Sequence, residues 1–476
     1  MKKMKRALAA LLAVCCVLPL AACGVSVRPS GGPDPTAQPD PTSAPEPTAI
    51  VERKNYAVAL ASYPETAAFP DESKYWTEDG EFDNDKYSED YDKWATERRE
   101  RVSLQAKYAA GLDGFLDASI RQFLADSKDG NAVYSPLNVY MALAMLAETA
   151  GGNSRAQILG LLGASGIEEL RAQANALWRS NYRDDGAVTS LMANSLWLNE
   201  EVSFNKDTLK TLAEEYFASS FSGRMGDPAF DSALQEWINE NTGGLLKEQA
   251  SGLHMDAQTI ITLASTIYYR GKWMSQFEPS ATKKDSFNLP GGGTLECDFM
   301  HKGAAGDYYW SDDFAAVALE VEESGSMWLI LPDEGVTPAD LLESGEATDF
   351  LLGRKAANSK HLIVNMSVPK FDVSSKMELV PGLKQLGVTD VFDGALADFT
   401  PLDAEGGSVT NVEHAARVKI DEEGLEAAAY TVIMRCGAAM PPDEEVDFTL
   451  DRPFLFAITG EDGLPLFVGV VNRPVE

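Results

Sequence analysis

The sequence predicts an α+β fold with large antiparallel sheets, on two observations. Segments with apolar residues at helical spacing come first, and strand-like segments rich in β-branched and aromatic residues dominate later. Helices and strands also do not alternate regularly along the chain. No internal repeat is apparent, and nothing in the composition divides residues 103–476 into two domains.

The expected helices and strands each have a local signal. The segment 106–126 has apolar residues on one helical face, and 138–150 is a mostly apolar helix that begins after Ser135 and Pro136. The segment 233–244 is a further helix that ends on two glycines. Strands are expected where β-branched and aromatic residues fall between turn residues, at 260–269, 316–322, 326–332, 362–373, 417–421, 453–460 and 466–474.

The N-terminus has the pattern of an export signal. Four basic residues within the first six precede an apolar run over residues 7–20, which is too short for a comfortable membrane-spanning helix. The end of this run, "LAAC", resembles the lipobox of bacterial lipoproteins, in which the cysteine becomes the lipidated first residue. We therefore expect residues 1–22 to be a lipoprotein signal peptide and Cys23 to carry the lipid anchor. Cleavage by an ordinary signal peptidase is the alternative.

Two segments separate this signal from the predicted domain. Residues 23–50 are rich in proline and lack apolar periodicity, so they are expected to form a disordered tether. Residues 51–102 are dense in Tyr, Trp and acidic residues, without sustained periodicity, and form an acidic N-terminal extension. Within it, "DGEFDNDKYSED" has acids at alternate positions but lacks the central glycine and final glutamate of a calcium-binding EF-hand loop. A solvated acidic surface is therefore the prediction.

The charge and the cysteines exclude some classes of protein. The chain has 40 Lys and Arg residues against 73 Asp and Glu residues, and four of the basic residues belong to the signal, which leaves a net charge near −37 after its removal. Such a surface repels nucleic acid and anionic lipid. Beyond Cys23, only Cys297 and Cys436 remain, so a disulfide framework is not expected, although these two could form a single bridge.

The sequence lacks the motifs that are typical of enzyme active sites. The chain has four histidines, no G-x-S-x-G elbow, no Walker loop, no G-x-G-x-x-G that opens a helix and no His/Cys cluster at metal spacing. Ser203 and Lys206 form an S-x-x-K pair of the β-lactamase type, but K-T-G and S-D-N are absent, so a chance match is the better interpretation. We expect neither an enzyme nor a cofactor or metal site.

Five stretches follow one another along the chain: "VYSPLNVYMALAMLAETAGGNSRAQILGLLG", "LQEWINENTGGLLKE", "LASTIYYRGKWMSQF", "FTLDRPFLFAI" and "LFVGVVNRP". In this order they together resemble the serpin family, and the match covers essentially residues 103–476, the length of one serpin domain. The resemblance implies the serpin fold, with large antiparallel or mixed sheets, about eight to nine surrounding helices and an exposed reactive-centre loop. It also makes Trp273 the tryptophan of the family's breach, near the point of loop insertion.

The resemblance places the stretch "DEEGLEAAAYTVIM" at the hinge of that loop. In an inhibitory serpin, a protease cleaves the loop and forms an acyl-enzyme. The loop then inserts as a new strand of the main sheet and distorts the protease before deacylation. The implied hinge consists of Glu422, Glu423, Gly424, Leu425, Glu426, Ala427, Ala428, Ala429, Tyr430 and Thr431.

The physical properties of this stretch suit insertion. An entering strand loses water and places alternate side chains on opposite faces. If roughly ten new ladder bonds are each worth about 1 kcal/mol net, with apolar burial added, the gain can drive a conformational change. Gly424 would supply backbone freedom at the pivot. An ordinary exposed loop rich in alanine is the alternative. One face of the inserted strand would be small or apolar almost throughout, with Leu425, Ala427, Ala429, Thr431 and Ile433.

Three residues depart from the family's loop pattern. Leu425 stands where the family usually has Thr or Ser, Tyr430 interrupts the run of small residues, and Arg435 falls on the inward-facing register. Leucine is uncharged and can be buried, so we expect inhibition to survive, with slower insertion.

The family's usual spacing also locates the scissile bond. Counting from Gly424 places it between Ala438 and Ala439, and Met440 is the competing residue because this stretch looks about two residues longer than in common members. Small or medium apolar residues suit a narrow, apolar primary pocket. Elastase-like or subtilisin-like serine proteases are therefore the expected targets.

A polar latch is expected where the sheet opens. His414 matches the family's shutter histidine, whose usual partners are an Asn in the strand of "LASTIYY" and a Ser after "SP". Here Ser265 and Asn138 stand at these places, so the two partner types are exchanged. We expect Asn138, Ser265 and His414 to form a rearranged latch, because a buried imidazole needs partners at both nitrogens. A core histidine bonded only to backbone is the alternative.

Together these observations predict a monomeric serpin that is lipid-anchored to the bacterial cell surface, or secreted, and inhibits extracellular serine proteases. Nucleic acid is not an expected partner. The first alternative is a non-inhibitory serpin that acts as a surface binding protein, suggested by Leu425 and Tyr430. The second is an exported enzyme or solute-binding lipoprotein, which the N-terminus permits and the domain motifs disfavour.

Overall fold

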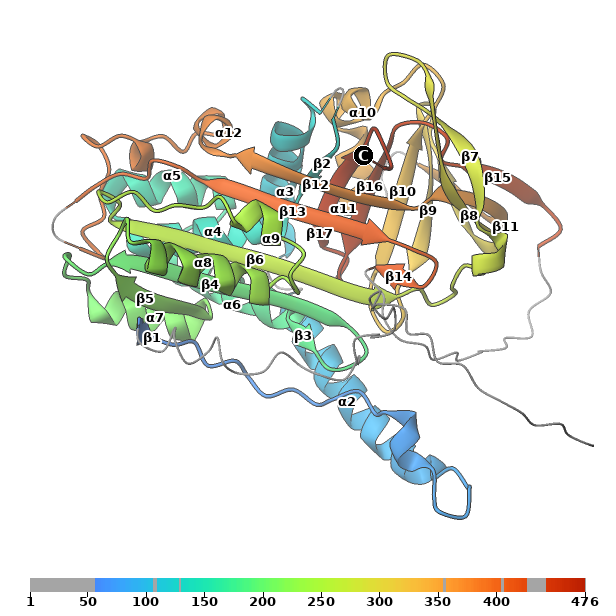
Figure 1. Ribbon diagram of the computed structural model, residues 1–476, viewed down its shortest axis with the longest axis horizontal. Coiled ribbons are helices and arrows are strands. Elements are labelled where there is room, and N and C mark those ends of the chain that lie inside the picture. The colour runs from blue at the N-terminus through green and yellow to red at the C-terminus, as the bar shows by residue number, and fades with distance from the viewer. Residues whose placement is uncertain are drawn as a thin grey trace, which may run out of the picture. The chain divides into compact units, whose positions relative to one another are not determined.

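The computed structural model describes residues 56–105, 109–127, 130–353, 357–403, 406–425 and 442–475. Glu46–Glu476 form one compact unit, in which helices pack around two large β-sheets (Figure 1). Each sheet contains one parallel pair of strands among antiparallel pairs. The predicted α+β class with large mixed sheets is confirmed.

The first sheet, called the main sheet below, has eight strands, and the second has nine. In spatial order the main sheet runs β1 (Ala57–Ala59), β5 (Ala218–Gly223), β4 (Thr189–Asn199), β6 (Ile261–Lys272), β14 (Gly424–Leu425), β13 (Glu413–Ile420) and β12 (Phe371–Glu378), with β3 (Arg183–Asp184) paired to β4. The second sheet runs β15 (Glu445–Thr449), β11 (Asn358–Pro369), β8 (Thr294–Trp310), β9 (Phe314–Glu320), β10 (Ser326–Pro332), β16 (Phe454–Thr459), β17 (Pro465–Val471) and β2 (Ala132–Tyr134), with β7 (Lys283–Asn288) paired to β8. The strand expected at 362–373 is therefore two strands that belong to different sheets.

The described residues contain eleven α-helices, more than the eight to nine that the resemblance implied. The difference arises from short helices with too few residues for a periodic pattern and from one helix in the N-terminal extension. No described helix is long and apolar enough to cross a membrane. The helices are α2 (Asn84–Gln105), α3 (Ala109–Leu124), α4 (Pro136–Thr149), α5 (Gly152–Leu162), α6 (Ile167–Asn181), α7 (Lys206–Glu215), α8 (Pro228–Glu240), α9 (Lys247–Ala250), α10 (Pro338–Ser344), α11 (Glu346–Gly353) and α12 (Val380–Gln385).

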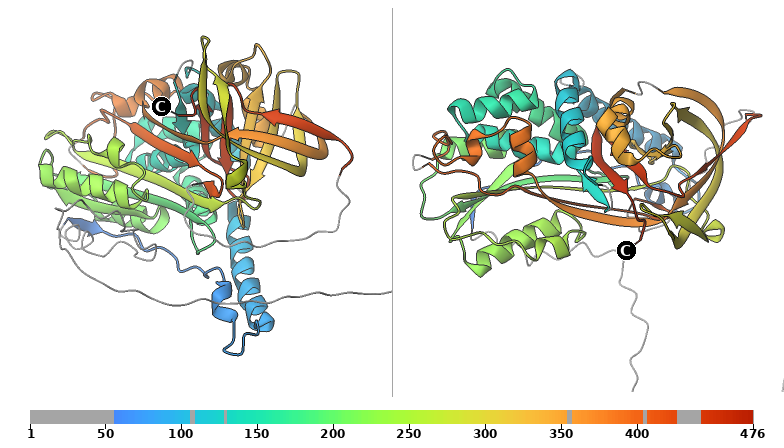
Figure 2. Two further views of the ribbon diagram at one scale, coloured as in Figure 1. Left: turned by 45° about the vertical axis from the view of Figure 1, so that its right-hand side comes forward. Right: turned by 90° about the horizontal axis from the view of Figure 1, so that it is seen from above.

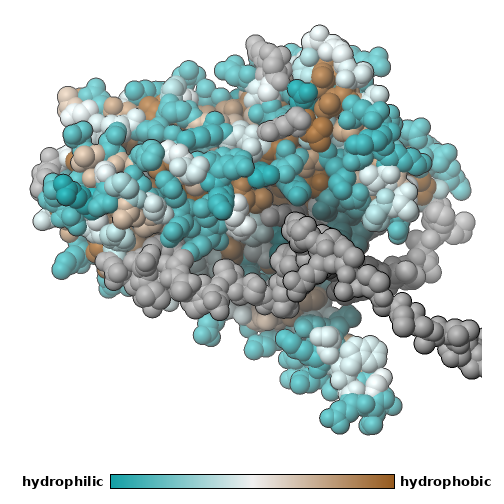
Figure 3. All heavy atoms as spheres, in the orientation of Figure 1, coloured by the Kyte–Doolittle hydropathy of each residue, from teal (hydrophilic) through white to brown (hydrophobic). Residues whose placement is uncertain are grey.

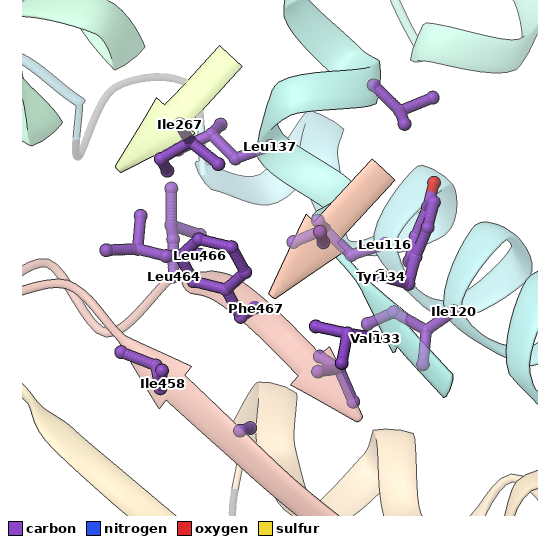
Figure 4. Close-up of a cluster of buried hydrophobic side chains, with 14 of the residues drawn as sticks. Leu116, Ile120, Val133, Tyr134, Leu137, Ile267, Ile458, Leu464, Leu466 and Phe467 are labelled. Carbon is purple, nitrogen blue, oxygen red and sulfur yellow. The ribbon is translucent and has the colours of Figure 1, made fainter. Parts of the chain in front are cut away.

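The largest apolar core lies between the two sheets and the helices next to them. Figure 4 shows side chains from α3, β2, β6, β16 and β17 in one cluster, among them Ile120, Val133 and Phe467. Ile267 of β6 reaches the same cluster. Helix α8 covers the opposite face of the main sheet (Figure 2). The core therefore fixes one face of β6, while one edge of this strand contributes to the candidate site.

The N-terminal extension is folded onto this unit, which the sequence did not lead us to expect. Strand β1 pairs antiparallel with β5, and the N–H of Ser222 donates to the carbonyl of Tyr56 at 2.7 Å. In α2, Trp94 is 1% exposed and its Nε1–H donates to the Asp185 carboxylate at 3.1 Å. The sequence analysis missed α2 because this helix is mostly charged and is held by a few aromatic side chains rather than by an apolar stripe.

Candidate functional site

The candidate site begins at the turn that joins β13 to β14. The Asp421 carboxylate accepts the N–H groups of Glu423 and Gly424 at 2.9 and 3.2 Å. The N–H of Asp421 donates to the carbonyl of Gly424 at 3.1 Å. Aspartate favours turns because its side chain can bond the backbone two residues ahead. The first residues of the predicted hinge therefore form a tight, locally stabilised turn.

Two strand edges face each other beyond this turn. Strand β14 pairs with β6 through Gly424 and Leu425, and with β13 through Leu425 and Ile420. Both pairings are antiparallel, so β6 and β13 run parallel to each other. In the part of the chain that the structure describes, no other strand lies between them. We call the interval between residues 261–270 of β6 and residues 413–419 of β13 the lane.

Leu425 closes one end of the lane. Its side chain is 2% exposed and packs in the main core. A cavity of about 20 Å³ beside it is lined by neighbouring residues of both strands, including Ile267, Tyr268, Val418 and Lys419. The cavity therefore lies between the two strands, at the place where a longer β14 would continue.

Trp273 connects the turn to the end of β6. Its side chain is 2% exposed, and its Nε1–H donates to the carbonyl of Asp421 at 2.9 Å. Its backbone N–H donates to the carbonyl of Glu423 at 3.0 Å, and it forms an isolated bridge with Val321. The structure therefore places Trp273 directly against the start of the hinge.

Glu422 is held by two residues that the sequence analysis did not identify. Its carboxylate accepts from Lys370 Nζ and from Thr282 Oγ1, both at 2.7 Å. Burial alone would raise the pKa of Glu422, but the hydrogen bonds from Lys370 and Thr282 outweigh it and hold the pKa below its ordinary value. No sequence signal could have found these partners, because they lie 52 and 140 residues away.

The reason for glycine at position 424 differs from the one we expected. A Cβ atom on Gly424 would lie 2.2 Å from the carbonyl oxygen of Gly271 and 2.8 Å from Cα of Lys272. The backbone of β14 therefore approaches β6 too closely for any side chain. Close approach, rather than conformational freedom at a pivot, requires this glycine.

The three expected latch residues separate into two groups of hydrogen bonds. Asn138 Nδ2 donates to the carbonyl of Ser265 at 3.1 Å, and the Ser265 hydroxyl contacts Asn138 Oδ1. The same hydroxyl lies 2.8 Å from Oδ1 of Asn194, a residue of β4 that the sequence analysis missed. His414 Nε2 instead accepts the backbone N–H of Ser135 at 3.0 Å. The observed side-chain latch is therefore Asn138, Ser265 and Asn194, and the histidine bond is to backbone, as in the alternative.

Comparison with known proteins gives this arrangement a family. The model of the family described as "Serpin (serine protease inhibitor)" matches residues 116–474. The chain belongs to the serpin family. Serpin-Z1C of Triticum aestivum is 29% identical over 398 residues, which cover 80% of this chain and 98% of that protein.

Solved structures support the same assignment. The native state of tengpin, a thermophilic serpin, is 25% identical and superposes with a TM-score of 0.68 over 77% of this chain and 94% of that one. AtSerpin1 of Arabidopsis, in the native stressed conformation, is 26% identical with a TM-score of 0.66 over 79% of this chain and 98% of that one. Serpins are generally serine protease inhibitors and not enzymes, so the expectation of a non-enzymatic serpin is confirmed.

The other predicted residues of this serpin have varied positions. Ser203 is exposed before α7, and Lys206 is the first residue of that helix. Cys297 is buried, which raises the pKa of its thiol to about 11. Within the described ranges, no cluster of three or more His, Cys, Asp or Glu residues could hold a metal ion. Outside the described residues lie Cys23, Glu426, Ala427, Ala428, Ala429, Tyr430, Thr431, Ile433, Arg435, Cys436, Ala438, Ala439 and Met440.

Replacing Asn138 by serine should loosen the main sheet of this serpin. The shorter side chain cannot reach the carbonyl of Ser265, so we expect a loss of about 1 kcal/mol in the free energy of unfolding. Polymerisation on mild heating should become faster. Urea unfolding and native gels measure both quantities. If neither changes, the contacts of Asn138 do not hold the sheet closed.

Acidification should destabilise this serpin through His414. Burial lowers the pKa of His414 from 6.5 to about 4, and Nε2 accepts a hydrogen bond, so the native imidazole is neutral. The unfolded chain binds a proton near pH 6.5, so this contribution is complete above that pH and is lost as the pH falls toward 4. The loss should reach on the order of 3 kcal/mol.

Urea unfolding measured between pH 7 and pH 4 checks this expectation. A His414→Gln variant should lack this component of the pH dependence, because glutamine does not titrate. An identical pH profile in both proteins would contradict the assignment to His414. The neighbouring phenol of Tyr134 does not contribute, because burial raises the pKa of Tyr134 far above this range.

Proposed function

We propose that this serpin inhibits extracellular serine proteases, of elastase-like or subtilisin-like specificity, as a suicide substrate. The protease serine attacks the carbonyl carbon on the acyl side of the scissile bond, between Ala438 and Ala439 or after Met440. The peptide bond breaks, an ester forms, and the new amino terminus takes the proton. Insertion of the cleaved loop into the lane then carries the ester-bound protease away before water can hydrolyse the ester.

The observation that carries the proposal is the lane with β14 at its end. Gly424 already pairs with β6, and Leu425 pairs with both β6 and β13, so the first two residues of an inserting strand are in place. Further residues would gain ladder bonds on both edges without a new nucleation step. We infer that the trap is primed at the hinge rather than fully outside the sheet.

The register of β14 also predicts how the rest of the hinge would fit. If the pairing continues residue by residue, Ala427 falls between Tyr269 and Val418, on the inward side with Leu425. Tyr430 falls on the opposite side, which α8 covers (Figure 2). Its direct neighbours there would be the small residues at 266 and 415. Tyr430 would therefore not have to enter the main core, which removes one objection to efficient trapping.

Covalent trapping is tested by incubating the purified chain with an active elastase-like protease and a subtilisin-like protease. The proposal predicts a complex that survives denaturing electrophoresis with at least one of them. Cleavage of the loop by both enzymes without any complex would contradict it and favour a non-inhibitory serpin. N-terminal sequencing of the released C-terminal fragment identifies the cleaved bond.

We also propose that the protein is held at the bacterial surface by lipid on Cys23, with residues 23–50 as the tether. The end of the signal sequence and the proline-rich segment support this localisation. In an expressing bacterium, the wild-type chain should fractionate with membranes, and a Cys23→Ala variant should not. Equal release of both proteins into the medium would contradict the anchor.

A further inference from the structure

The N-terminal extension carries an exposed aromatic surface that loop insertion does not use. Trp76 is 60% exposed, although it lies between two ordered elements, the 3-10 helix η1 (Glu72–Tyr75) and α2. Its backbone forms a bridge with Phe82, and hydrogen bonds between Thr77 and Glu81 close the turn between them. We call residues 71–92 the aromatic finger. Figures 1 and 2 show this segment extending away from the two sheets.

A continuous series of ring contacts connects the tip of the aromatic finger to the folded body. Centroid distances are 5.2 Å for Trp76 and Phe82, 5.4 Å for Phe82 and Tyr87, and 6.2 Å for Tyr87 and Tyr91. Tyr91 lies 5.4 Å from Trp94, which is buried. These contacts fix the platform on which the exposed indole stands. Because the indole is already held in place, its side chain would lose little conformational entropy when a partner covers it, which favours affinity.

The surroundings of this platform are strongly anionic. Figure 3 shows the outer end of the finger as pale residues among hydrophilic ones. The finger has two lysines, Lys74 and Lys86. Its exposed acidic residues are Asp71, Glu78, Asp79, Glu81, Asp83, Asp85, Glu89 and Asp92. This charge repels nucleic acid, anionic lipid and a second copy of this acidic chain, and it attracts a protein surface with a basic patch.

The base of the finger lies at the same end of the main sheet as the hinge. The hydroxyl of Tyr91 donates to Glu323 at 3.3 Å, and Arg98 forms an ion pair with the same carboxylate at 3.0 Å. Glu323 belongs to the turn after Val321, which bridges Trp273. Trp273 in turn binds the carbonyl of Asp421. One short turn therefore connects the finger to the start of the reactive-centre loop.

We propose that the aromatic finger is a second docking surface for the target protease, which is then a serine protease with a basic surface patch. This inference rests on the proposed function, because the target protease is the partner that binds the adjacent reactive-centre loop. Trp76 supplies the apolar contact, and the surrounding carboxylates accelerate encounter and select cationic enzymes over neutral or acidic ones.

The test measures binding without the covalent step. Two proteases are used, a cationic elastase-like enzyme and an anionic subtilisin-like enzyme, each with its catalytic serine replaced by alanine. Their Kd values are measured for the wild-type chain, for Trp76→Ala, and for a triple variant with Glu78→Gln, Asp79→Asn and Glu81→Gln. A matched control neutralises three exposed acids elsewhere, with Glu200→Gln, Glu201→Gln and Glu334→Gln. Equal thermal midpoints show that the variants keep their fold.

We expect both finger variants to bind the cationic protease about tenfold more weakly at low salt. At high salt the loss should shrink for the triple variant, because its charges are screened, and persist for Trp76→Ala, because its contact is apolar. The control variant and the anionic protease should show no such loss. An unchanged Kd in the finger variants, or an equal loss in the control, would overturn the proposal. So would a dimer of the wild-type chain that Trp76→Ala abolishes, because the finger would then bind a second copy.

The same proteins separate this inference from the proposed function. If active proteases form no covalent complex with the wild-type chain but the finger variants still lose affinity for the inactivated cationic enzyme, trapping fails and docking stands. If covalent complexes form at rates that the finger variants do not change, trapping stands and docking is wrong.

Discussion

Replacement of Leu425 by arginine should convert the protein from an inhibitor into a substrate. Leu425 is 2% exposed and lies between β6 and β13, so a guanidinium there would be buried without a partner. An unpaired buried charge costs several kcal/mol. We expect the arginine to stay outside the sheet and to prevent the loop residues that follow it from inserting. Loop cleavage should then continue, and the complex stable to denaturing electrophoresis should fall below detection.

The matched control for this prediction is Leu425→Met, which keeps the apolar character and about the same volume. This variant should form the covalent complex nearly as well as the wild type. If Leu425→Arg formed complex at the wild-type yield, entry of Leu425 into the sheet would not be required for trapping.

Replacement of Trp273 by alanine should produce the largest loss of stability near the hinge. The side chain is buried, and its Nε1–H holds the carbonyl of Asp421. Removing a buried indole costs about 3–5 kcal/mol and leaves a cavity beside the turn. We expect this loss in the free energy of unfolding, measured by urea, together with faster spontaneous loss of inhibitory activity on storage.

A Trp273→Phe variant separates packing from the hydrogen bond. Phenylalanine retains most of the apolar volume but cannot donate to Asp421, so it should lose activity on storage with a smaller loss in the free energy of unfolding. A change of less than about 1 kcal/mol for Trp273→Ala would contradict the role of this side chain as the support of the turn.

The sequence was sufficient for the parts of the site that follow from order and spacing. Five motifs in one order identified the family, and the resemblance placed the start of the hinge at Glu422, Glu423 and Gly424, where the structure shows the turn between β13 and β14. The inward direction of Leu425 followed from the two-residue period of a strand. These inferences needed only local pattern and chain order.

Contacts across the fold could not be predicted in this way. Asn194 joins Ser265 from 71 residues away, and Lys370 joins Glu422 from 52 residues away, because strand pairing brings them together. The role of Gly424 was misjudged for a similar reason, since the crowding comes from the backbone of β6. Helix α2 was not predicted from the sequence, because its few aromatic contacts do not produce an apolar stripe at helical spacing.

Insertion of a strand between β6 and β13 is the central claim, and the thermal midpoint of unfolding before and after loop cleavage tests it most directly. A protease that cuts within residues 426–441 supplies the cleaved protein. About ten new ladder bonds at about 1 kcal/mol each should raise the midpoint by at least about 10 °C, and the cleaved Leu425→Arg variant should show no rise. An unchanged or lower midpoint after cleavage of the wild-type chain would contradict insertion.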